Sequence, residues 1–72
     1  MDKRSLELYG IEYSNGLSLG EYHKSLLSAK RSASKKLFYP NSVEIYCPDG
    51  GVWYKGFWAL SHGFGWYNWE ER

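Results

Sequence analysis

One helical repeat of apolar residues constrains the fold of this chain more than any other feature. The apolar positions recur every three or four residues, at Leu19, Tyr22, Leu26, Ala29, Ala33 and Leu37. That spacing predicts one face of an α-helix of about 18 residues. Ser18 and Glu21 have the spacing of a capping box at its start, and Pro40 prevents its continuation. Ala33 is expected to pack this helix on the rest of the core.

The segment before the predicted helix has the pattern of a β-strand. Residues 5–16 alternate apolar with acidic side chains, and the alternation shifts by one position at Gly10. A shift at a glycine is typical of a β-bulge. Asn15 and Gly16 then supply the residue types of a tight turn. We therefore expect a bulged strand that ends at this turn.

Three further strands are expected after the helix. They cover residues 43–47, 52–60 and 66–69, and turn sequences separate them at 48–51 and 61–65. Short turns between consecutive strands favour an antiparallel meander. The order β-α-β-β-β predicts an α+β fold, in which one amphipathic helix packs on one face of an antiparallel sheet of about four strands.

The length of 72 residues predicts a single domain, residues 1–72. Cys47 is the only cysteine, so it cannot form an internal disulfide, and its alternation with Val43 and Ile45 predicts a core position. One cysteine and two histidines do not make a usual zinc site, and we expect no metal or cofactor. No apolar run is long enough for a signal peptide or membrane span, so we expect a protein of the bacterial cytoplasm without a membrane partner.

Positive charge is concentrated in the predicted helix, although the formal net charge is only +1. The helical spacing places Lys24, Arg31 and Lys35 opposite the apolar face, with Lys30 beside them. Surface helices that serve only solubility usually mix acidic with basic residues, and none of the residues between these four is acidic. These bases are candidates for contact with a polyanion or an acidic protein. A merely solvated helix face is the alternative.

Aromatic residues are unusually frequent, with four Trp, seven Tyr and three Phe. One helix covers one face of the sheet, so some rings must lie on the uncovered face. Trp66 and Trp69 are three positions apart in the predicted last strand, on opposite faces. We expect one of the two to be exposed in a monomer or buried in a homodimer. Exposed rings anchor protein interfaces and also stack on unpaired bases, and the sequence favours neither use.

Residues 27–54 carry a resemblance to a known family. The segment "AKRSASK", a short loop, "SVEIY", a "DG" turn and a Trp-bearing strand resemble small phage anti-CRISPR proteins of type I-F. The resemblance implies one helix on an antiparallel sheet, and helix bases that contact an RNA-guided surveillance complex and block its target DNA. It assigns this role to Lys30, Arg31 and Lys35. The longer, Trp-rich C-terminal part departs from the family.

Together these features predict a non-enzymatic phage anti-defence protein. Its partner would be a bacterial protein or nucleoprotein defence complex, contacted by Lys24, Lys30, Arg31, Lys35, Trp66 and Trp69. The alternative is a direct nucleic-acid-binding module, with bases on phosphates and rings on nucleobases; weak, nonspecific DNA or RNA binding is expected in either case. His23 and His62 have no nucleophile or carboxylate at a catalytic spacing, so catalysis is not expected.

Overall fold

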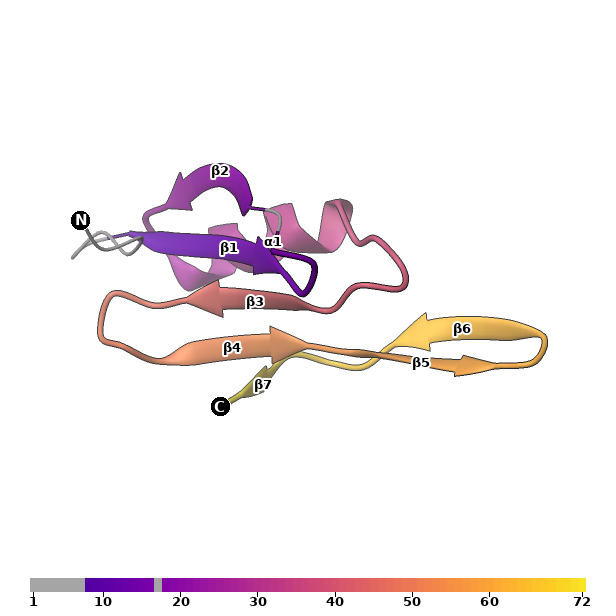
Figure 1. The fold of residues 1–72 in the computed structure, drawn as a ribbon. Coiled ribbons are helices and arrows are strands. Elements are labelled where there is room, and N and C mark those ends of the chain that lie inside the picture. The colour runs from indigo at the N-terminus through magenta and orange to yellow at the C-terminus, as the bar shows by residue number, and fades with distance from the viewer. Residues whose placement is uncertain (1–7, 17) are drawn as a thin grey trace.

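A computed structural model describes residues 8–16 and 18–72 and has the expected α+β architecture, with one helix packed on an antiparallel sheet. The start of the predicted first strand, residues 5–7, lies outside the described residues. The elements are, in chain order, β1 (Tyr9–Tyr13), β2 (Ser18–His23), α1 (Leu26–Lys35), β3 (Val43–Tyr46), β4 (Val52–Lys55), β5 (Phe57–Leu60), β6 (Gly63–Trp66) and β7 (Glu70–Glu71) (Figure 1).

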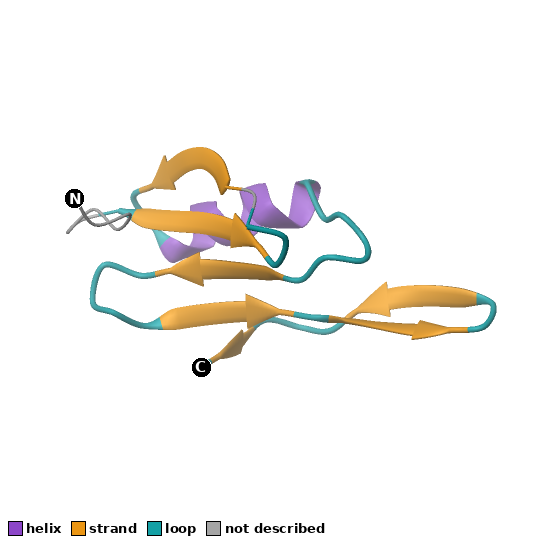
Figure 2. Ribbon diagram, viewed as in Figure 1, coloured by secondary structure: helices purple, strands orange, loops and turns teal. Residues whose placement is uncertain are grey.

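Five of the strands form the main sheet, in the order β2-β1-β3-β4-β7, and every neighbouring pair is antiparallel. Strands β5 and β6 form a separate two-stranded sheet. The helix lies behind β1, β2 and β3, and none of the elements in the described residues forms a second layer on the opposite face of the main sheet (Figure 2). Within the described part of the chain, no helix is long and apolar enough to span a bilayer.

The chain between the first turn and the helix differs from the prediction. The N–H of Gly16, at φ 85°, donates to the carbonyl of Tyr13 across 2.9 Å, as the Asn15-Gly16 turn predicts. The chain then returns along β1 as β2, where a helix had been expected. The predicted capping box at Ser18 is therefore wrong. The pairing of β1 with β2 is irregular next to Gly10, where a bulge was predicted.

The helix begins seven residues later than predicted, at Leu26. Ser25 is its N-cap, and its hydroxyl accepts a hydrogen bond from the N–H of Ser28 across 3.1 Å. This bond satisfies one of the free amides of the first turn. At the other end, the hydroxyl of Tyr13 donates to the carbonyl of Lys36 and joins the helix to β1.

A small apolar core lies between the helix and the main sheet. It is formed by Ile11, Tyr13, Ala29, Ala33, Val43 and Ile45. Two alanines on the helix face allow its backbone to approach the sheet closely, and the predicted core position of Ala33 is confirmed. Cys47 is also buried, as its alternation with Val43 and Ile45 predicts.

The predicted strand at 52–60 is divided at Gly56. The part before the glycine is β4, which pairs with β3 and β7, and the part after it is β5, which pairs only with β6. The β5–β6 hairpin therefore leaves the main sheet and projects beyond the helix (Figure 1). It gives the molecule an elongated shape of 42 × 19 × 19 Å.

The predicted last strand at 66–69 is not formed. Trp66 is the last residue of β6, whereas Trp69 lies in the segment that precedes β7, so the two rings do not share a strand. The segment between them crosses from the hairpin back to the edge of β4, where Tyr54 pairs with Glu70. The sequence pattern could not show this change of partner.

Candidate partner-binding surface

The helix-free face of the main sheet carries a row of acidic residues. Glu12 of β1 lies opposite Glu44 of β3, which lies opposite Tyr54 of β4, which in turn lies opposite Glu70 of β7. Their sequence neighbours point toward the helix, so this row points away from it. The charges are partly compensated by Arg72, whose guanidinium lies 3.8 Å from Glu44 and 3.7 Å from the centre of the Tyr54 ring.

Tyrosines, rather than the predicted tryptophans, are the rings of this face. The hydroxyl of Tyr46 donates to the carboxylates of Glu12 and Glu44, at 3.2 and 3.3 Å. Burial and the negative charges of Glu44 and Glu12 raise the pKa of Tyr46 above its ordinary value. The phenol therefore stays protonated and donates, which lets two acidic side chains lie on neighbouring strands.

The helix side of the molecule carries two of the predicted bases. Arg31 and Lys35, one helical turn apart, are exposed on the outer surface of α1. Lys24 is exposed as well, but it lies between β2 and α1 and not on the helix, because the chain before Ser25 is extended. We call Lys24, Arg31 and Lys35 the basic surface. The exposed side chain of Leu27 also lies on the outer side of α1.

Lys30 and Trp69 belong to a second group, in which lysines lie over tryptophan rings. The Nζ of Lys30 is 3.7 Å from the centre of the Trp53 ring, and the Nζ of Lys55 is 5.6 Å from that of Trp69. Because Trp53 and Lys55 lie opposite core residues of β3, they point to the helix side of β4. We call Lys30, Trp53, Lys55 and Trp69 the Lys–Trp row. Its charges are on the same side of the sheet as the basic surface.

Lys36, which follows α1 as its C-cap, forms an ion pair within the chain. Lys36 donates to the carboxylate of Glu21 on β2, which also accepts a hydrogen bond from the hydroxyl of Ser32 across 2.8 Å. These bonds, with a further one from His23, lower the pKa of Glu21 to about 2. His23 lies at the end of β2, and not in the helix as predicted. Its Nδ1 is 2.8 Å from the hydroxyl oxygen of Ser28. The cluster ties α1 to the edge strand.

Trp66 and Trp69 are both half-buried in the single chain. This contrasts with the expectation that one of them would be exposed. Trp66 makes edge contacts with Phe57 and Phe64, at 5.8 and 6.5 Å between ring centres, whereas Trp69 packs against the main core. The exposed large apolar side chains of residues 56–68 are others: Trp58, Leu60, Phe64 and Tyr67. A signal for them exists in the sequence, since residues 56–68 contain no Asp, Glu, Lys or Arg.

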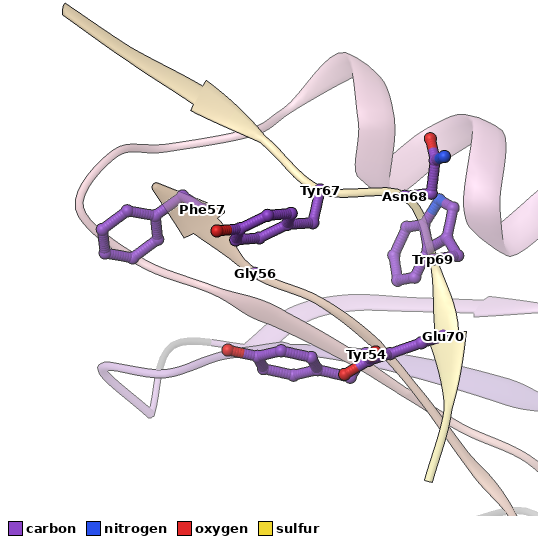
Figure 3. A pocket seen from close by; sticks show the side chains of 7 residues that line it. All are labelled: Tyr54, Gly56, Phe57, Tyr67, Asn68, Trp69 and Glu70. Atoms are coloured by element: carbon purple, nitrogen blue, oxygen red, sulfur yellow. The ribbon is translucent and has the colours of Figure 1, made fainter. Parts of the chain in front are cut away.

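An open pocket of about 530 Å³ lies where the hairpin joins the main sheet. Its lining consists of Tyr54, Gly56, Phe57, Tyr67, Asn68, Trp69 and Glu70. The rings of Tyr54 and Tyr67 lie on opposite sides of it (Figure 3). Aromatic walls of this kind suit a flat or a cationic group. The lining holds no pair of a nucleophile with a histidine base.

Among the described residues, no three His, Cys, Asp or Glu side chains lie close enough together to hold a metal ion. Comparison of the chain with family models, with curated proteins and with solved structures gives no match. The arrangement of charge and rings is therefore the basis for an inference about function.

Proposed function

We propose that this chain is a small, non-enzymatic binding protein that docks through its helix side onto an anionic partner. The proposal rests on the separation of positive and negative charge between the two sides of the molecule. Arg31 and Lys35 are exposed on the outer side of α1, and Lys24 is exposed between β2 and α1, whereas the row of Glu12, Glu44 and Glu70 lies on the other face of the sheet. A partner with negative potential is attracted by one side of the molecule and repelled by the other, which fixes the orientation of docking.

The partner that fits best is a nucleoprotein defence complex of the bacterial cytoplasm. The resemblance of residues 27–54 to phage anti-CRISPR proteins supports this narrower proposal, as do the positions of Lys30, Arg31 and Lys35 on α1. The helix side would contact the RNA or an acidic protein surface of the complex. The acidic sheet face would then point outward, where it repels the phosphates of incoming DNA.

Direct binding of nucleic acid is a second candidate, favoured by the Lys–Trp row. A lysine beside each tryptophan offers a phosphate contact next to a ring on which a base can stack. Both tryptophans are half-buried, however, and both lysines already lie over them. With a formal net charge of only +1, this module would bind weakly.

Affinity capture from bacterial lysate, followed by mass spectrometry, tests the proposal. Arg31→Glu and Arg72→Glu are matched variants, because both replace an exposed arginine and change the net charge equally, on opposite sides of the sheet. We expect the wild type and Arg72→Glu to retain a ribonucleoprotein complex and Arg31→Glu to lose it.

Nuclease treatment then separates the two candidates. A complex that stays bound after digestion is held by protein contacts, and one that is released was held by nucleic acid. If Arg31→Glu and Lys35→Glu both retain the same partners as the wild type, the basic surface is only a solvated helix face, and the proposal is wrong.

A further inference from the structure

The β5–β6 hairpin is an unusual surface element for a small domain. It projects beyond the helix, and no residue from 56 to 68 is acidic, lysine or arginine (Figure 1). Each of its strands is four residues long, and among the described strands each pairs only with the other. A two-stranded sheet is marginally stable in water unless an apolar layer covers it. A hairpin of this kind is therefore stabilised by apolar contacts on its faces.

The chain itself covers part of one of the two faces. The register pairs Phe57 with Trp66 and Ala59 with Phe64, so the three aromatic rings share a face. Tyr39, from the loop after α1, stacks on Phe64 with 4.2 Å between ring centres and meets Phe57 edge-on at 5.1 Å. This intramolecular aromatic cluster stabilises the hairpin from one side.

On the other face Trp58 and Leu60 are exposed, no described residue is packed over them, and the shape of the face is uneven. It pairs Trp58 with Gly65 and Leu60 with Gly63, so one strand presents large side chains and the other presents none. The Trp58 ring fills the space over Gly65, where an added Cβ would lie 2.4 Å from it. Over Gly63 an added Cβ would meet nothing within 4 Å. Leu60, which is 64% exposed, thus projects beside the open space over Gly63.

We propose that this face is covered by a second copy of the chain, related by a two-fold axis, with Leu60 of each copy over Gly63 of the other. A two-fold interface must be complementary to itself, and a projecting side chain beside a gap meets that requirement. It must also avoid placing a charge against its own copy, and this face has none. Two such hairpins face to face form a small sandwich with an apolar interior.

The assembly would leave the basic surface free, because the hairpin projects away from α1 (Figure 1). Each dimer would then present two basic surfaces to a partner. Two linked contacts bind more tightly than one when the partner offers two sites at the matching distance. This inference does not depend on the partner being a defence complex.

Sedimentation equilibrium of the full chain over a wide concentration range tests the pairing directly. We expect a reversible equilibrium between the 8.4 kDa chain and a dimer of twice that mass. Leu60→Glu places two like charges together and should raise the dimer dissociation constant about a hundredfold. Asn68→Glu is the control, since it adds the same charge at an exposed position outside the hairpin and should leave the constant unchanged.

Two further variants separate loss of pairing from loss of folding. Gly63→Leu fills the gap within its own chain, where the space is open, and should leave a folded monomer by circular dichroism. Leu60→Glu mixed with Leu60→Lys should restore the dimer that each lacks alone. A wild type that stays monomeric at every concentration overturns the proposal, as does a dimer unaffected by Leu60→Glu. If the monomer instead binds lipid vesicles through Trp58, this face contacts a membrane and not a second copy of the chain, which also overturns the proposal.

Discussion

Among single residues, Glu21 makes three polar contacts, two of which join β2 to α1 and to the residue after it. Its carboxylate accepts hydrogen bonds from Lys36, Ser32 and His23, and these lower its pKa from 4.5 to about 2. A lowered pKa means that the ionised form favours the folded state. The resulting contribution to stability is complete above pH 4.5 and disappears as the pH falls toward 2.

The change Glu21→Gln tests this linkage. The variant should melt at a lower temperature than the wild type at pH 7, and the difference should shrink as the pH falls from 4.5 to 2, because protonation removes the same charge from the wild type. Thermal melts followed by circular dichroism across this pH range measure it. Glu71→Gln, which removes an exposed carboxylate from β7, serves as the control. A constant difference between Glu21→Gln and the wild type at all pH values contradicts the assignment.

At the level of elements, the first residue of the helix is where the structure differs from the sequence prediction. Ser25 caps α1 through the N–H of Ser28, so Ser25→Ala should lower the free energy of unfolding by about 1 kcal/mol. Urea denaturation measures the change. Ser34→Ala, at an exposed position within the helix, should be neutral or slightly stabilising because alanine has the higher helix propensity. Equal effects of the two substitutions would contradict the assigned cap.

The sequence predicted the helix and its core face correctly but not its first residue. Tyr22 and Leu26 continue the helical spacing of Ala29 and Ala33, so periodicity alone extends the helix backward into β2. The structure resolves the conflict in favour of the Asn15-Gly16 turn, because a tight turn after β1 returns the chain beside it and pairs the backbone of β2. The turn at Asn15-Gly16 therefore decided the structure of this segment, because only two residues of the apolar repeat, Leu19 and Tyr22, precede the N-cap Ser25.

The C-terminal elements were less predictable for a related reason. The apolar sequence around Gly56 is continuous, yet the strands on its two sides have different partners. One of these partners is the two-residue strand β7, which is too short to carry a pattern. Pairing between distant segments decides such boundaries, and local sequence does not contain that information. The exposed bases were easier to predict, since Arg31 and Lys35 depend only on the helical period.

For the whole molecule, the separation of charge predicts how binding to nucleic acid depends on salt. The basic surface offers three exposed bases, and each phosphate that is neutralised contributes about 0.9 to the slope of log affinity against log salt. We expect weak binding to duplex DNA of any sequence, with a slope of about −3, that fades between about 50 and 200 mM salt. Fluorescence anisotropy with a labelled duplex measures it. Arg31→Glu should reduce the magnitude of the slope of log affinity against log salt by about one. Arg72→Glu, on the acidic face, should leave it unchanged, and equal slopes for both variants would show that DNA does not distinguish the two sides.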